Sequence, residues 1–73
     1  MRIKSIGIGP LRWYIEIWPN SEQENKEFYR WIKDNFPNCF FKRRQSPDSY
    51  TKYYWEVRGS NYEEYVAIML AWV

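Results

Sequence analysis

The chain has 73 residues, a net charge of +2, a single cysteine and no histidine, and aromatic residues make up 22% of it. A chain of this length is expected to form one small domain. Without histidine, and with Cys39 as the only thiol, it lacks the groups from which most catalytic triads and zinc sites are built. We therefore expect a protein that is not an enzyme and that holds no cofactor or metal. No apolar run approaches the roughly 18 residues of a membrane-spanning helix, so we expect no membrane contact. The sequence shows no signal-peptide segment, and its cysteine is free, so we expect a cytoplasmic protein.

Two strands are predicted at the beginning of the chain. Residues 12–18 (RWYIEIW) alternate between apolar and polar side chains, which is the pattern of a half-buried strand. Trp13, Ile15 and Ile17 then point to one face, and Arg12, Tyr14, Glu16 and Trp18 point to the other. A short strand at residues 2–8 is predicted to pair back on it through the bend at residues 7–10.

The first helix is predicted after residues 21–24 (SEQE), which fit the S-x-x-E capping box. It ends before Pro37, because proline disfavours helical geometry in the residue before it. Its apolar residues form one amphipathic stripe at helical spacing: Phe28, Trp31, Ile32 and Phe36.

A hairpin follows. Residues 39–45 (CFFKRRQ) are predicted to form a short strand whose phase the sequence leaves open, since either Phe40 or Phe41 can face the core. The turn residues 46–49 join it to a strand at 50–58. In that strand Tyr53, Trp55 and Val57 are expected in the core, and the opposite face carries Lys52, Tyr54, Glu56 and Arg58.

The second helix is predicted after residues 60–63 (SNYE), a second capping-box match, and runs to the end of the chain. One side of it is predicted to carry Tyr62, Val66, Met69, Leu70 and Val73. Its apolar arc spans roughly 200°, about twice the width that packing on one sheet needs. Either the first helix covers this extra width, or a partner or second copy is contacted by Tyr65, Ile68 and Trp72.

The order of the elements predicts an α+β two-layer sandwich. The strands at 12–18 and 39–45 are joined through a helix, so they are expected to be parallel with a right-handed crossover. If the strand at 50–58 lies between them, both helices cover one face of the sheet, as in a ferredoxin-like fold. With residues 2–8 at the edge beside 12–18, the fold is a circularly permuted ferredoxin-like one with an antiparallel or mixed sheet. Such a fold carries no function by itself.

The uncovered face of that sheet is the first candidate site. Its predicted partner-binding residues are aromatic or basic: Tyr14, Trp18, Lys42, Arg44, Lys52, Tyr54 and Arg58. Unpaired nucleobases can stack on such rings while the lysine and arginine side chains hold phosphates. This arrangement resembles that of the RNA-recognition motif. However, residues 52–58 (KYYWEVR) lack the glycines of the RNP1 pattern of that motif, and Glu16 and Glu56 are expected to repel phosphate. Pairing of these carboxylates across strands with Arg12, Lys52 or Arg58 instead gives a solvated, charged face.

The aromatic surplus and the mixed charge favour a protein-binding module over an enzyme. We expect it to occupy the surface of a protein partner, in the manner of a phage-type inhibitor or adaptor, and a homodimer is one form that this contact can take. The alternative function is binding of single-stranded RNA or DNA by the exposed sheet face.

Overall fold

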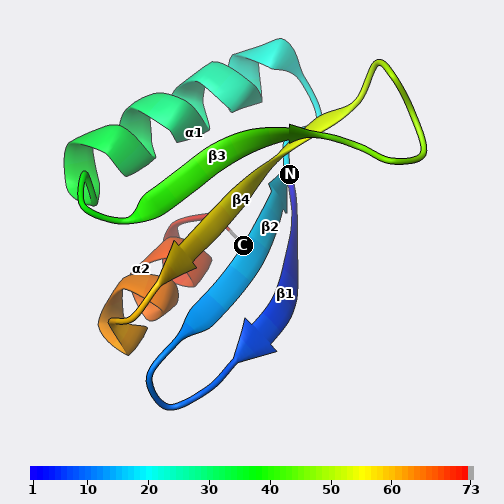
Figure 1. Cartoon of the computed structure of the whole chain (residues 1–73). Helices are drawn as coiled ribbons and strands as arrows, with labels where there is room; N and C mark the ends of the chain where they lie inside the picture. Colours follow the sequence, from blue (N-terminus) through cyan, green and yellow to red (C-terminus); the bar gives the residue numbers. More distant parts are fainter. Residues whose placement is uncertain (73) are drawn as a thin grey trace.

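The computed structural model describes residues 1–72 and shows a four-stranded sheet with two helices (Figure 1). The elements are, in order, β1 (Arg2–Ile8), β2 (Trp13–Trp18), α1 (Glu22–Asn35), β3 (Phe40–Gln45), β4 (Tyr53–Gly59) and α2 (Tyr62–Trp72). The strands lie in the order β1-β2-β4-β3, and every neighbouring pair is antiparallel. The protein therefore has a small α+β fold, and the predicted order of strands and helices is confirmed.

The edge strand β1 confirms the pairing predicted for residues 2–8. Its register against β2 shifts between Ser5 and Gly7, which leaves Ile6 unpaired in a bulge. At the other side of the sheet, β4 begins at Tyr53 rather than at residue 50, so the connection from β3 is longer than predicted. Ser46 closes this loop by donating its backbone N–H to the Lys52 carbonyl oxygen at 2.8 Å.

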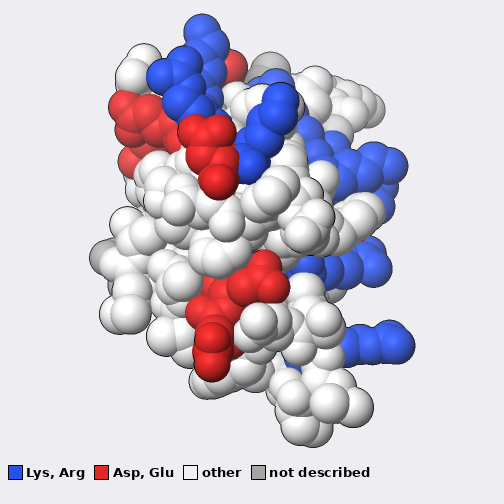
Figure 2. All heavy atoms as spheres, turned by 90° about the vertical axis from the view of Figure 1, so that its left-hand side faces the viewer, with Lys and Arg blue, Asp and Glu red and all other residues white. Residues whose placement is uncertain are grey.

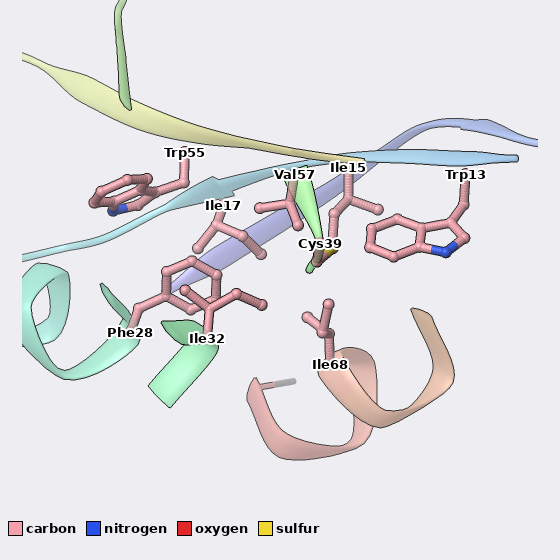
Figure 3. Close-up of a cluster of buried hydrophobic side chains, with 9 residues drawn as sticks. All are labelled: Trp13, Ile15, Ile17, Phe28, Ile32, Cys39, Trp55, Val57 and Ile68. Atoms are coloured by element: carbon pink, nitrogen blue, oxygen red, sulfur yellow. The ribbon is translucent and has the colours of Figure 1, made fainter. Parts of the chain in front are cut away.

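The core lies between one face of the sheet and the two helices. Figure 3 shows the side chains of β2 and β4 pointing toward α1 and α2, which both lie on this side of the sheet. The buried apolar residues are Trp13, Ile15, Ile17, Phe28, Ile32, Cys39, Trp55, Val57 and Ile68. Each large aliphatic or aromatic side chain buried here contributes about 1.5–3 kcal/mol, so this layer supplies most of the free energy that favours folding.

Two buried tryptophans tie the sheet to the helices through their ring N–H groups. Trp13 Nε1 donates to the Asn61 carbonyl oxygen at 2.8 Å, just before α2. Trp55 Nε1 donates to Asn25 Oδ1 in α1 at 2.7 Å. Both indoles therefore bury their apolar surface without leaving a polar atom unpaired.

The two helices begin in different ways. Ser21 Oγ accepts the Glu24 backbone N–H at 3.2 Å, which confirms the predicted N-cap of α1. At α2, Asn61 Oδ1 accepts the Glu63 backbone N–H at 2.9 Å, so the cap is Asn61 and the predicted capping box starting at Ser60 is wrong. Asparagine is as good an N-cap as serine, and here it stands one residue later.

The side of α2 that carries Tyr62, Val66 and Leu70 faces away from the core. Ile68 is fully buried, whereas Tyr62, Val66 and Leu70 are exposed. Because α2 is apolar on nearly all sides, its periodicity does not select the buried face, and packing against the sheet decides it. Val73, predicted on the same side, lies outside the described residues.

One strand residue that was predicted in the core is exposed. Tyr53 pairs with Gln45 at the hairpin end of β4, beyond the part of the strand where Trp55 meets α1. Its side chain is 42% exposed, and the Arg43 guanidinium lies 4.6 Å from its ring centroid. The alternation along β4 therefore predicts on which face of the sheet Tyr53 lies, but it does not predict that the side chain is exposed.

A substitution at Gly59 tests the packing of Trp13. A Cβ atom at Gly59 overlaps the Trp13 indole, which cannot move freely because it is buried and hydrogen-bonded to Asn61. We expect Gly59→Ala to lower the free energy of unfolding by about 1–3 kcal/mol in urea denaturation followed by tryptophan fluorescence. Gly7→Ala is the matched control, because a Cβ there meets no atom within 4 Å, and its effect should stay within about 0.5 kcal/mol. Equal effects of the two substitutions would contradict this packing.

Candidate functional site

The face of the sheet opposite the helices is the candidate site, and we call it the open face. Strand pairing brings its side chains into cross-strand rows, one of which runs from Lys4 through Glu16 and Glu56 to Lys42. The register also fixes the phase of β3, because Phe41 pairs with Val57 on the core side. The open face comprises Arg2, Lys4, Tyr14, Glu16, Trp18, Phe40, Lys42, Arg44, Tyr54, Glu56 and Arg58.

Most of the predicted partner-binding residues come together on this face, namely Tyr14, Trp18, Lys42, Arg44, Tyr54 and Arg58. Lys52 instead lies just before β4 and lines an adjoining cleft. Sequence reasoning missed Arg2 and Lys4. Both alternate with Ile3 in β1, and that alternation, together with pairing to β2, is the signal that places them on the open face.

Glu56 organises the charges of the open face. Its side chain is only 5% exposed, although no helix covers it. Arg44 Nε donates to Oε1 of Glu56 at 3.0 Å, and the Arg58 guanidinium forms an ion pair with Oε2. Glu56 thus pairs across strands with Arg44, which was not among the predicted partners, and with Arg58 of its own strand, so the carboxylate is neutralised where it lies. Glu16 accepts the Trp18 Nε1–H at 3.1 Å, and within residues 1–72 it forms no ion pair.

Arg58 also contacts two aromatic rings. Its guanidinium carbon lies 5.2 Å from the ring centroid of Tyr14 and 5.3 Å from that of Phe40. Each such cation–π contact at an exposed site contributes about 0.5–1 kcal/mol. Together with the ion pair to Glu56, these contacts hold the guanidinium in one orientation.

A second aromatic pair lies at the other end of the open face. The rings of Trp18 and Tyr54 stack with centroids 4.6 Å apart and an interplanar angle of 21°. The Arg2 guanidinium lies 5.3 Å from the Trp18 centroid. One face of each stacked ring is therefore used within the protein, and less of it is free to stack on a nucleobase.

The Tyr14 hydroxyl stays protonated at neutral pH. Burial raises the pKa of this hydroxyl above its usual 10.0, and the nearby carboxylates of Glu56 and Glu16 raise it further. Tyr14 is therefore a hydrogen-bond donor to any acceptor that approaches the open face.

The charge of the open face is positive. The strand register places five basic side chains and two carboxylates on it, and the carboxylate of Glu56 is already neutralised by Arg44 and Arg58. In Figure 2 the basic side chains project along the right-hand edge, on the side of the sheet that faces away from the helices. By contrast, α2 contains Glu63 and Glu64 and no base. The molecule therefore presents differently charged surfaces on its two sides.

A cleft of about 500 Å³ extends the open face beyond the end of β2. It contains three bases, Arg2, Arg43 and Lys52, and Arg43 lies 3.8 Å from the Glu22 carboxylate in an exposed ion pair. The cleft is lined by Arg2, Trp18, Pro19, Asn20, Ser21, Glu22, Asn25, Arg43, Thr51, Lys52 and Tyr53. It is polar and open, and it continues the basic surface around the edge of the sheet.

The three α2 residues predicted to contact a partner lie largely inside the protein. Ile68 is in the core, so its predicted place on a contact surface is wrong. Trp72 is half-buried, and its ring centroid lies 5.5 Å from that of Phe28 in α1. The first helix therefore covers the side of α2 that carries Trp72. Tyr65 is half-buried, with its hydroxyl 3.2 Å from Ser5 Oγ of β1.

The only thiol, that of Cys39, lies in an environment that disfavours its reactive thiolate form. Cys39 is buried, its Sγ–H donates to the Arg58 carbonyl oxygen at 3.0 Å, and burial raises the pKa of the thiol from its usual 9.0 to about 12. Within residues 1–72, no three Cys, Asp or Glu side chains come together as a metal site. In the same range, no helix is long and apolar enough to cross a membrane.

Comparison of the chain with protein-family models, with curated proteins and with solved structures found no match. The open face is therefore interpreted from its own geometry.

Removal of the Glu56 charge tests the network on the open face. Glu56→Gln removes both ion pairs, keeps an acceptor oxygen for only one of the two guanidinium groups, and leaves Arg44 and Arg58 without a counter-charge. Since both arginines are partly exposed and can be solvated, we expect a loss of only about 1–2 kcal/mol in the free energy of unfolding. Glu16→Gln, which keeps an acceptor for Trp18, should change it by less than about 0.5 kcal/mol. Thermal unfolding followed by circular dichroism compares the two variants, and a larger effect at Glu16 would contradict the assignment.

The raised pKa of Cys39 predicts a slow reaction of the native thiol. The thiolate is the reactive form, and at pH 8 the buried thiol with a pKa of about 12 stays protonated. We expect Ellman's reagent to modify Cys39 at least about 100-fold more slowly in the native protein than in urea. Because the folded pKa lies above the unfolded one, this contribution to stability is complete below pH 9.0 and is lost as the pH rises toward 12. Fast modification at pH 8 in the native state would contradict this environment.

Proposed function

We propose that the protein is a non-enzymatic binding module that uses its open face to contact an acidic surface of a protein partner. The observation that supports it best is an uncovered sheet face on which tryptophan, tyrosine and arginine side chains are already fixed by contacts with one another. These are the residue types that dominate binding energy in protein interfaces.

The open face is ordered before any partner binds. Arg58 is held by Glu56 and by the rings of Tyr14 and Phe40, and Trp18 is stacked on Tyr54. Immobilising a side chain on binding costs about 0.5–1.5 kcal/mol, so side chains that are fixed in advance retain more of their contact energy as affinity. Preorganisation of this kind favours recognition of one defined surface.

The charges support an acidic partner. Lys4 and Lys42 are exposed at the two ends of their cross-strand row, and neither forms an ion pair within residues 1–72. The carboxylates between them are neutralised, in Glu56, or hydrogen-bonded to an indole, in Glu16. A partner with carboxylates spaced to meet the two lysines gains attraction and a faster association.

We further propose that the protein acts as an inhibitor or adaptor that occupies its partner's surface, and that it works in the cytoplasm, where a free thiol such as Cys39 persists. The finer description of its fold as a circularly permuted ferredoxin-like one is part of this proposal. It is supported by the strand order β1-β2-β4-β3, with β1 at the edge beside β2.

Binding of single-stranded RNA or DNA is the second candidate. It is favoured by the lysine and arginine side chains of the open face and of the adjoining cleft. It is disfavoured by the Trp18–Tyr54 stack, since single-stranded nucleic acids are held mainly by rings whose faces are free for bases.

Charge reversal on the open face tests the proposed function. We expect the double substitution Lys4→Glu and Lys42→Glu to weaken capture of the proteins bound by the wild type at least about tenfold, because both lysines are exposed on the open face and neither forms an ion pair within residues 1–72. The matched control is Lys26→Glu with Arg30→Glu, which makes the same change of charge on exposed residues of α1 behind the sheet. Quantitative affinity capture from a lysate measures the difference.

Two results would contradict the proposal. Equal capture by both double variants would show that the open face is not the binding surface. Binding of a fluorescent single-stranded oligonucleotide at low salt, lost on reversal of Lys4 and Lys42, would favour the second candidate. A flat titration would remove that candidate.

A further inference from the structure

The exposed aliphatic residues of the protein gather on one side. Within residues 1–72, the large exposed aliphatic side chains are Ile6, Ile8, Leu11, Val66 and Leu70, and all of them belong to β1, to the β1–β2 hairpin or to α2. Leu70 and Leu11 are 80% and 76% exposed. Large exposed residues near β3 and α1 are instead aromatic, such as Tyr29 and Tyr53. This segregation differs from the scattered single residues that are normal on a protein surface.

These elements adjoin one another in space. Ile8 pairs with Trp13, whose ring centroid lies 6.0 Å from that of Tyr65 in α2. The Tyr65 hydroxyl reaches Ser5 of β1, and its ring lies 5.4 Å from that of Tyr62. Figure 1 shows the tip of the β1–β2 hairpin and the first turn of α2 at the same end of the molecule. Tyr65 therefore connects α2 to the edge of β1, and Tyr62 follows it toward the outer side of the helix.

The exposed apolar side chains of α2 form a straight ridge. Tyr62, Val66 and Leu70 follow one another at intervals of four residues, so they lie on one side of the helix. Ile68 points into the core, and Val66 and Leu70 are each two positions, about 200°, away from it. The ridge thus faces away from the sheet. We call the surface formed by Ile8, Leu11, Tyr62, Val66 and Leu70 the β1–α2 flank.

We infer that the β1–α2 flank is the contact surface for a second copy of this chain in a two-fold symmetric dimer. In such a dimer the same patch meets itself, so an apolar patch is self-complementary while a charged one is repelled. The five residues of the flank are uncharged, with the exposed Glu63 beside them in the first turn of α2, whereas the open face holds five basic side chains against two carboxylates and repels its own copy. Between these two surfaces, only the flank suits a second copy.

The ridge on α2 fits this symmetry. When two such ridges pack in antiparallel fashion, Val66 meets Val66 of the second copy at the two-fold axis, and Tyr62 meets Leu70 of the second copy on each side. Since Glu63 and Glu64 lie in the first turn of α2, antiparallel packing places the two acidic ends at opposite ends of the contact. The carboxylates of the two copies are therefore kept apart.

The area of the flank sets the strength of the dimer. Its five side chains expose on the order of 500 Å² per copy, so the contact can bury at most roughly 1,000 Å² in total, at the lower limit for specific interfaces. A weak dimer results, with a dissociation constant between about 10 μM and 1 mM. The dimer leaves both open faces free, so it can present two copies of the proposed partner-binding surface at once.

Sedimentation equilibrium on the full chain tests this inference. From about 10 μM to 1 mM protein, the average mass of the wild type should rise from 9.1 kDa toward twice that value. Leu70→Lys brings a charge into the contact of both copies and should raise the dissociation constant at least about tenfold. Tyr50→Lys is the matched control, because Tyr50 is 90% exposed in the β3–β4 loop and gains the same charge away from the flank. Circular dichroism verifies that both variants are folded.

Several results would overturn the inference. One is a wild-type mass that stays at 9.1 kDa up to about 1 mM. Another is a dimer that Leu70→Lys weakens no more than Tyr50→Lys does. Backbone NMR shifts on dilution give an independent readout, and they should be confined to β1, the hairpin and α2. Shifts confined to β3 and β4 would place the contact elsewhere, and none of these outcomes depends on the partner proposed for the open face.

Discussion

Burial of one side of the β2–β4 strand pair is the interaction on which the rest of the structure depends. Ile15, Ile17 and Val57 lie at the centre of the sheet and are fully buried against α1 and α2. The chain has only two helices, and both are needed on this side to cover the central strands. The other side of the same strands must therefore remain folded and soluble without a second layer.

The open face meets this requirement with internal contacts. Arg44 and Arg58 neutralise Glu56, Arg58 lies between two rings, and Trp18 stacks on Tyr54. These contacts shield apolar ring surface from water without a covering helix, and they also fix the side chains that we propose for recognition. Stability and the binding that we propose therefore draw on the same large aromatic side chains.

The sequence predicts this fold well wherever one face of an element differs from the other. Alternation in β2 and the stripe of α1 place Trp13, Ile15 and Phe28 correctly, and Ser21 marks the beginning of α1. The phase of α2 cannot be predicted, because a helix that is apolar nearly all round has no distinct buried stripe. The phase of β3 cannot be predicted either, because Phe40 and Phe41 are adjacent and each could face the core. The contribution of β1 to the open face and the stacking of Trp18 on Tyr54 depend on long-range strand register, which local sequence does not specify.

The bulge in β1 has a consequence for the behaviour of the protein at high concentration. A regular, uncharged edge strand offers its free N–H and C=O groups to other chains and so seeds fibrils. Here the unpaired Ile6 interrupts the ladder on one edge, and Lys42, Arg43 and Arg44 occupy the other edge in β3. Both edges of the sheet thus carry features that disfavour pairing with the edge strand of another chain, and with it amyloid-like aggregation of an aromatic-rich chain.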